Sequence, residues 1–103
     1  MKRKASISQD EAEAVIRELR KNPEFAAEYL RAAPEDADEP RVLLMALRRI
    51  AKARGGIAKI AKAAGIERES LYRALSAHGN PRLSTLVAVT KAVGLKLIVE
   101  AAQ

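Results

Sequence analysis

The stretch Ile57–Ser76, IAKIAKAAGIERESLYRALS, decides how this chain folds. Its spacing is that of a helix-turn-helix. A short first helix places Ala61 where two helices cross closely, and Gly65 follows where the turn needs a positive φ. In the second helix, Leu71 and Leu75 point inward. The second helix of such a motif lies in the DNA major groove, so the stretch indicates a DNA-binding regulator rather than an enzyme.

The outward face of the second helix carries the side chains that we expect to read bases. Arginine makes a bidentate contact to guanine, glutamate accepts from cytosine, and the first turn of a recognition helix reaches deepest. The predicted base-reading residues are Arg68, Glu69, Ser70, Tyr72 and Arg73. Two alternatives stay open: Glu69 and Arg73 form only a surface ion pair, or Tyr72 packs against the following helix.

Four residues are predicted to contact DNA phosphates, which position a protein without reading sequence. Lys59 and Lys62 lie on the first helix of the motif, which crosses the backbone. Ser76 lies near the end of the second helix, and Arg82 precedes the next helix. Ordinary solvation is the alternative for the three cations.

The charge of the chain is divided unevenly. The net charge is +6, but residues 1–40 hold seven Lys/Arg and ten Asp/Glu, a net −3. Residues 41–103 hold twelve Lys/Arg and three Asp/Glu, a net +9. A strongly basic segment suits a polyanion, because neutralised phosphates release their counterions. The predicted helix-turn-helix lies inside this basic segment.

Other functional classes find little support in the composition. The chain has no cysteine and one histidine, so we expect neither a metal site nor a cofactor. A catalytic triad of His78 with Ser70 or Ser76 and an acid is conceivable, but we expect no enzyme. The longest apolar runs are too short to span a bilayer. No apolar stretch follows the basic start, residues 1–4, so we expect a cytoplasmic protein without a signal peptide.

Helix signals divide the rest of the chain. Ser8 and Glu11 form a predicted capping box, and Asn22 with Pro23 restarts the helix. The residues that follow, 34–40, read as an acid-rich linker or loop. Further helices are expected at 40–54, 57–64, 67–77 and 83–93.

Near the C-terminus, Gly79 is expected to supply an unusual turn angle. Leu83, Leu86, Val87, Thr90 and Val93 form the predicted apolar stripe of the last helix. Residues 95–101 are rich in branched aliphatics and read as a β-strand. A lone strand needs a partner, so a homodimer is expected. Its predicted contacts are Leu97, Ile98 and Val99.

The predicted fold is therefore all-α: a lambda-repressor-like helix-turn-helix domain with an N-terminal helical arm and a short C-terminal β-strand. The predicted organisation is an acidic helical arm and linker at 1–39, a DNA-binding domain at 40–94, and the strand at 95–103.

The basic half resembles the Cro/Xre-type helix-turn-helix domains, and more closely their addiction-module antidote subgroup. The segments that carry the resemblance are ESLYRALS (69–76), GNPRLSTL (79–86) and VGLKL (93–97). It extends back over NPEFAAEYLRAA (22–33) and DEPRVLLMALRRIAKARGG (38–56).

The resemblance implies an antitoxin that binds a small toxin related to the RelE-type ribonucleases and, as a dimer on operator DNA, represses its own operon. An acidic arm is compatible with a basic toxin. Two alternatives remain: an antitoxin that neutralises a protein without binding DNA, and a stand-alone phage-type repressor.

Overall fold

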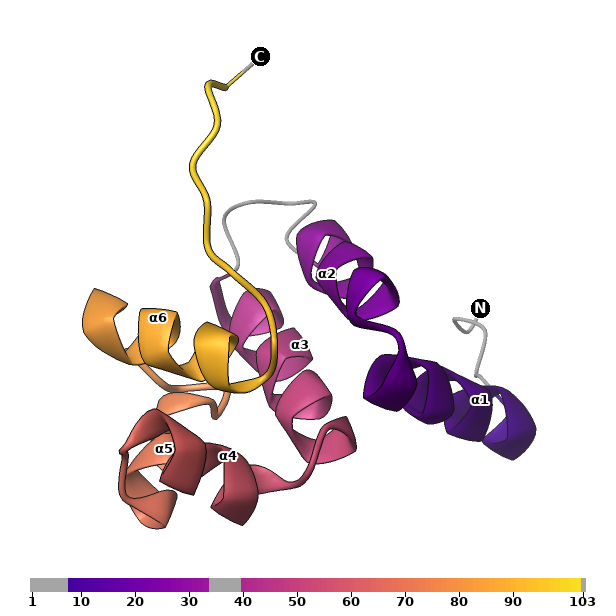
Figure 1. Ribbon diagram of the computed structural model, residues 1–103, viewed down its shortest axis with the longest axis horizontal. Helices are drawn as coiled ribbons and strands as arrows, with labels where there is room; N and C mark the ends of the chain where they lie inside the picture. Colours follow the sequence, from indigo (N-terminus) through magenta and orange to yellow (C-terminus); the bar gives the residue numbers. More distant parts are fainter. Residues whose placement is uncertain (1–7, 34–39, 103) are drawn as a thin grey trace, which may run out of the picture.

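The computed structural model describes residues 8–33 and 40–102, and within them the chain forms six α-helices (Figure 1). The predicted basic start and the linker segment 34–39 lie outside the described residues. The helices are α1 (Gln9–Lys21), α2 (Pro23–Ala32), α3 (Pro40–Ala53), α4 (Ile57–Ala64), α5 (Arg68–Ala74) and α6 (Leu83–Ala92). None of the helices in the described ranges is long and apolar enough to cross a membrane.

The starts of α1 and α2 confirm the predicted caps. The Ser8 hydroxyl accepts from the Glu11 amide at 3.1 Å, and the Glu11 carboxylate accepts from the Ser8 amide at 3.1 Å. The Asn22 side chain accepts from the amides of Glu24 and Phe25, with Pro23 in the first turn. The cap at Asn22 explains why α1 ends at Lys21 and a separate helix, α2, begins at Pro23.

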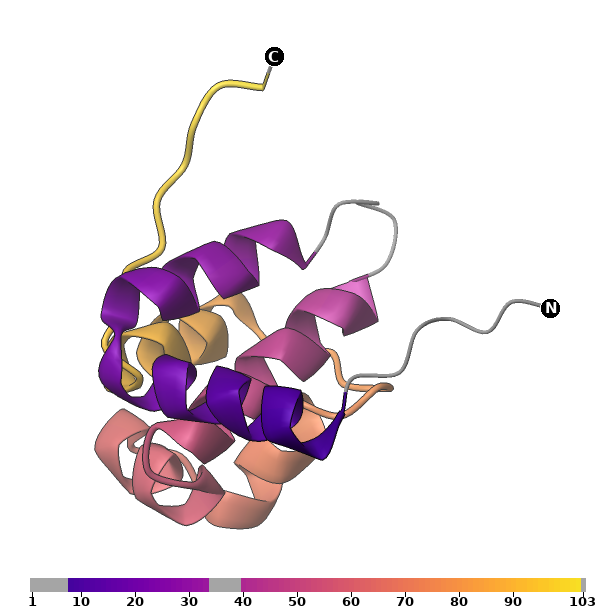
Figure 2. The same cartoon turned by 90° about the vertical axis from the view of Figure 1, so that its right-hand side faces the viewer.

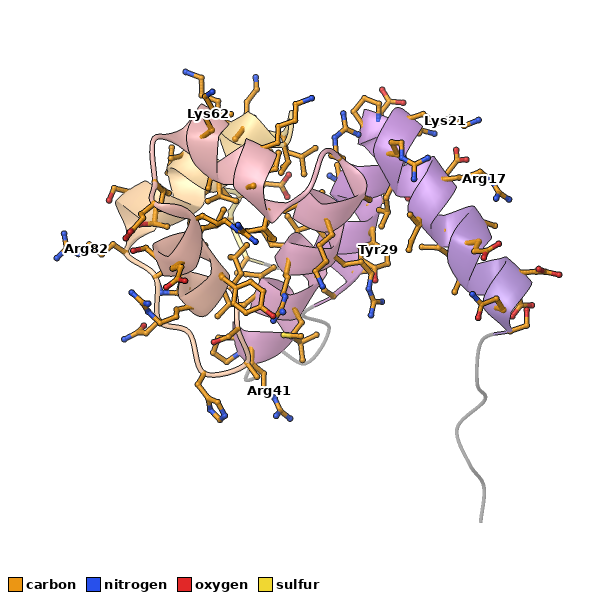
Figure 3. The ribbon with its side chains drawn as sticks, turned by 90° about the horizontal axis from the view of Figure 1, so that it is seen from below. Arg17, Lys21, Tyr29, Arg41, Lys62 and Arg82 are labelled. Atoms are coloured by element: carbon orange, nitrogen blue, oxygen red, sulfur yellow. The ribbon has the colours of Figure 1, made fainter. Side chains whose placement is uncertain are left out.

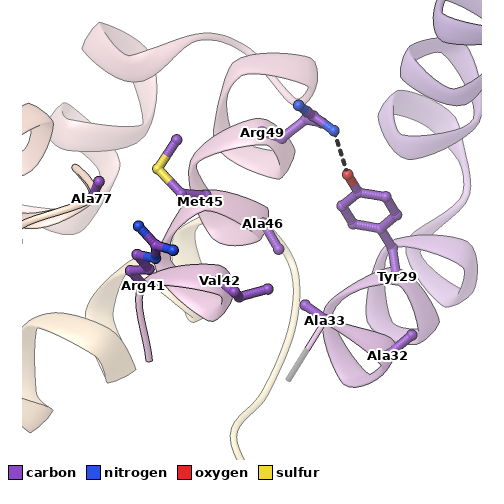
Figure 4. Close-up of a pocket in the computed structure, with 9 residues that line it drawn as sticks. All are labelled: Tyr29, Ala32, Ala33, Arg41, Val42, Met45, Ala46, Arg49 and Ala77. Atoms are coloured by element: carbon purple, nitrogen blue, oxygen red, sulfur yellow. Dashed lines mark hydrogen bonds between the residues drawn. The ribbon is translucent and has the colours of Figure 1, made fainter. Parts of the chain in front are cut away.

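Leu19, near the end of α1, has a carbonyl that its own helix cannot satisfy. A helical carbonyl normally accepts from the amide four residues later, and here that residue is Pro23, which has no N–H. Arg54, directly after α3, supplies the donor: its Nη1 lies 2.9 Å from the Leu19 carbonyl oxygen. A second bond, from Arg49 Nη1 to the Tyr29 hydroxyl at 2.8 Å, joins α3 to α2 (Figure 4).

The arm helices and the basic helices share one hydrophobic core. Figure 2 shows α1 and α2 lying over α3, and both pack against it. Leu19 and Ala26 are fully buried in the same cluster as Ile50, Leu71 and Val89. The predicted division into an arm and a domain remains a prediction, but the core runs continuously across it.

The turn between α4 and α5 has the predicted conformation. Gly65 lies in the left-handed region with φ 72°, and the amides of Gly65 and Ile66 bond to the last turn of α4. Ala61 is 2% exposed, as expected for a close crossing of helices, and Leu71 and Leu75 are fully buried. α5 is thus held by its apolar side.

Two details near the end of α5 differ from the predictions. The helix ends at Ala74 rather than at residue 77, and the Ser76 hydroxyl donates to the Arg73 carbonyl at 2.8 Å. Gly79 does not have a positive φ. A Cβ there would lie 2.0 Å from the Ala74 carbonyl oxygen, so glycine is needed for close approach.

The predicted C-terminal β-strand is wrong. Residues 95–102 form no regular secondary structure in the described chain, and Leu97, Ile98 and Val99 are exposed (48%, 68% and 97%). A strand exists only when its backbone pairs with another strand, and all six elements of the described chain are helices. Aliphatic composition alone therefore misled the prediction.

The apolar stripe predicted for α6 is partly wrong. Leu83 is 71% exposed and Val87 is 46% exposed, whereas Val89 is fully buried beside Thr90 and Val93. The hydrophobic core includes Val89 and Val93, so the buried side chains of this helix lie toward its C-terminal end, whereas Leu83 at its first position stays in solvent. The helix packs against α4.

Replacing Arg54 tests the bond to Leu19. We expect Arg54→Ala to lower the free energy of unfolding by about 1–3 kcal/mol, because a part-buried carbonyl loses its donor. Urea unfolding followed by circular dichroism measures this. The exposed neighbour change Lys52→Ala is the control, with an expected effect within about 0.5 kcal/mol. Equal effects of the two substitutions would contradict the role of Arg54.

Candidate nucleic-acid interface

α5 presents four long side chains to solvent on the face opposite its buried leucines. Arg68, Glu69, Tyr72 and Arg73 are all exposed, and together they line a shallow hollow of about 540 Å³. The structure thus brings four of the five predicted base-reading residues together. The fifth, Ser70, is half-buried and donates to the Glu67 carboxylate at 3.3 Å.

The two alternatives for these residues can be compared with the geometry. Within residues 40–102, which the structure describes, Glu69 and Arg73 form no ion pair with each other. Tyr72 does not pack into α6: it is 49% exposed, and the Arg48 guanidinium of α3 lies 4.3 Å from its ring centroid. Charged and aromatic groups of α5 therefore stay available to a ligand.

Arg48 is a residue that sequence reasoning missed. Its guanidinium stacks on Tyr72 in a cation–π contact, an interaction worth about 0.5–1 kcal/mol at exposed sites. The contact orients the tyrosine ring and adds a positive charge beside α5. The sequence pattern indicates only that Arg48 lies on the outward side of α3, and it does not predict a contact with Tyr72.

The predicted phosphate contacts lie around the edges of the α4–α5 face. Lys59 and Lys62 project from α4, Arg82 caps α6, and all three are exposed. Figure 3 shows this face from below, with Lys62 and Arg82 pointing away from the body at different edges. Ser76 is placed differently: its hydroxyl proton is already donated to the Arg73 carbonyl.

A second hollow lies on another side of the molecule. It has a volume of about 660 Å³ and separates α2 from the start of α3 (Figure 4). Val42 and Met45, which are 38% and 41% exposed, form part of its apolar wall, and Arg41 and Arg49 stand at its rim. No residue of this groove was predicted to have a function.

In the described part of the chain, no three side chains of the metal-binding types gather into a site. His78 is exposed, and within residues 40–102 the hydroxyls of Ser70 and Ser76 bond to Glu67 and Arg73 rather than to it. The four exposed side chains of α5 therefore line an open hollow on the surface of the molecule.

Comparison with known proteins gives the family. Residues 12–101 match the family model described as "Probable addiction module antidote protein". The chain belongs to this family. The match begins in α1, so the arm helices are part of what defines the antidote family along with the α4–α5 unit.

An uncharacterized protein of Haemophilus influenzae (strain ATCC 51907 / DSM 11121 / KW20 / Rd) is 46% identical to this chain over 63 residues. The match covers 61% of this chain and 64% of the relative, so the chain spans less than two thirds of that protein. No solved structure matches the chain.

Proposed function

We propose that this antidote is a DNA-binding repressor of the Cro/Xre type, in which α4 and α5 are a helix-turn-helix and α5 enters the major groove. In this proposal it has no catalytic activity. It binds operator DNA as a homodimer, represses its own operon, and neutralises a toxin related to the RelE-type ribonucleases.

One observation carries the DNA-binding part. Arg68, Tyr72 and Arg73 project from a short helix whose other side is anchored by the fully buried Leu71 and Leu75. A recognition helix needs this combination, because base contacts require long polar side chains on a rigidly held element. The net charge of +9 over residues 41–103 supplies the attraction to phosphates.

The proposed homodimer uses the exposed apolar C-terminal segment. Leu97, Ile98 and Val99 are solvent-exposed in the single chain, and burial against a second copy would remove them from water. The segment leaves the body on the side away from α4 and α5 (Figure 1). Pairing there leaves both α5 helices free to reach half-sites roughly 34 Å apart, one turn of DNA.

The proposed toxin contact uses the acidic side chains of the arm. Asp10, Glu11, Glu13, Glu24 and Glu28 are exposed on α1 and α2. A ribonuclease must approach RNA and is expected to be basic, so opposite charges would steer the two proteins together. A protein–protein interface formed through the arm would leave α5 unobstructed.

The first experiment is fluorescence anisotropy with labelled DNA from beside the protein's own gene and with random DNA of equal length, at 50–300 mM salt. Tighter, salt-dependent binding to the flanking DNA supports the repressor. Weak and equal binding to both would contradict it and favour an antidote that acts on a protein alone.

Two substitutions separate base reading from backbone contact. Arg73→Ala should cost about 1–3 kcal/mol on the flanking DNA and relax specificity, because a bidentate base contact is lost. Lys59→Ala should weaken binding to all sequences alike and reduce the salt slope by about one. Equal loss on random DNA after Arg73→Ala would show that Arg73 contacts only the backbone.

The dimer contact is tested by replacing Leu97, Ile98 and Val99 together with serine. All three side chains are exposed, so the fold should be kept while the apolar contact is lost. We expect monomers by light scattering and weaker operator binding. The matched control is the same number of serine substitutions at Ala63, Leu83 and Val87, which are also exposed. The control should remain a dimer, and a dimer that persists in the first variant would contradict the proposed contact.

The toxin contact is tested by charge reversal. Removal of the arm is unsuitable, because Leu19 and Ala26 belong to the core. The variant Glu13→Lys with Glu24→Lys should associate about 2–10-fold more slowly with the toxin of the same operon, since electrostatic steering is lost. Glu100→Lys in the C-terminal segment is the control. Unchanged association rates at low salt would contradict a role for the arm.

A further inference from the structure

A cluster of positive charge lies where α1, α3 and α4 meet. The hollow there has a volume of about 420 Å³ and is lined by Arg20, Lys52, Ala53, Arg54, Gly55 and Lys59. Four of these six residues are cationic, and none of the described residues that line the hollow is acidic. We call these residues the cationic hollow.

The fold assembles this cluster from distant parts of the chain. Arg20 comes from α1, Lys52 from the last turn of α3 and Lys59 from the first turns of α4. The bond from Arg54 to the Leu19 carbonyl holds the end of α1 against the α3–α4 loop, which places Arg20 there. The acidic arm therefore contributes a cation to the basic half.

Gly55 brings Lys59 into the same hollow. A Cβ at Gly55 would lie 2.8 Å from Cδ of Lys59, so the lysine stem passes close over the glycine, and both residues line the hollow. A lysine stem packs well on such a surface while its charge stays in water. The side chain predicted as a phosphate contact is thus a member of the cationic hollow.

Within the described parts of the chain, no acidic side chain pairs with the exposed cations of the hollow. Arg20, Lys52 and Lys59 are exposed, and none forms an ion pair with an acid of residues 8–33 or 40–102. Like charges held close together repel each other. A polyanion that passes over them removes this repulsion and releases its own counterions.

We infer that the cationic hollow binds the phosphates of the DNA strand that passes α4, so that Arg20 of the arm is a DNA contact. The inference rests on the proposed DNA binding. It follows because α4 would be the helix that crosses the backbone, and the hollow begins at Lys59 of that helix. Figure 3 shows α1 beside the α4–α5 face, with Lys21 and Lys62 along the same edge.

The chemistry of the hollow favours a backbone over a single small anion. Arg20, Lys52 and Lys59 are exposed and come from α1, α3 and α4, so a nucleic-acid strand that runs along the surface can meet all three. Lysine and arginine of this kind neutralise successive phosphates without reading bases. The arm then enlarges the DNA footprint without affecting sequence preference.

The test is the salt dependence of DNA binding by full-length Arg20→Ala and Lys52→Ala. Anisotropy is measured at 50–300 mM salt with the flanking DNA and with random DNA. Each change should reduce the slope of log K against log salt by about 0.9, and the double variant by about 1.8. The reductions should be equal on both DNAs. Circular dichroism confirms that each variant is folded, as expected because both side chains are exposed.

Arg17→Ala is the matched control. Arg17 is an exposed arginine on the same helix, is not part of the hollow, and points away from the body in Figure 3. It should leave the slope unchanged. A slope for Arg20→Ala equal to that of Arg17→Ala overturns the inference while the proposed function stands. Absence of salt-dependent DNA binding by the unaltered protein overturns both.

Discussion

The bond from Arg54 to the Leu19 carbonyl is the constraint on which the arrangement of the molecule depends. Pro23 starts α2 and has no N–H, so it cannot donate a hydrogen bond to the Leu19 carbonyl. The Arg54 guanidinium donates that hydrogen bond instead. The same guanidinium lies against Gly94, where a Cβ would be 3.3 Å from Nη2. The Arg54 side chain thus contacts both the end of α1 and the chain directly after α6.

That constraint explains how an acidic segment and a basic segment form one body. Charges of opposite sign are separated along the sequence, yet Leu19 and Ala26 contribute to the same core as the helices that follow. The polar surfaces remain distinct because burial involves only the apolar stripe of each helix. The proposed function would use these two surfaces for two partners of opposite charge.

The sequence was sufficient wherever a short-range rule decides the structure. The caps at Ser8 and Asn22 and the left-handed Gly65 follow from bonds within a few residues, and each is observed. The exposed set on α5 was predictable for the same reason, because buried Leu71 and Leu75 fix its orientation.

The predictions were wrong or missing where the structure depends on contacts between residues far apart in the sequence. Arg54 and Arg48 find their partners 35 and 24 residues away, and no local pattern names them. Gly79 was predicted to have an unusual backbone angle, but glycine is needed there because a Cβ would collide with the Ala74 carbonyl. The strand at 95–101 failed because pairing, and not composition, makes a strand.

The exposed C-terminal segment gives the proposed repressor a way to sense its own abundance. Val99 is 97% exposed in the single chain, and in the proposed dimer it becomes buried only when two copies meet. The population of pairs then grows with the square of the concentration of single chains. Occupancy of a two-half-site operator would rise steeply over a narrow range of protein levels, and the operon would be released quickly once the antidote falls below that range.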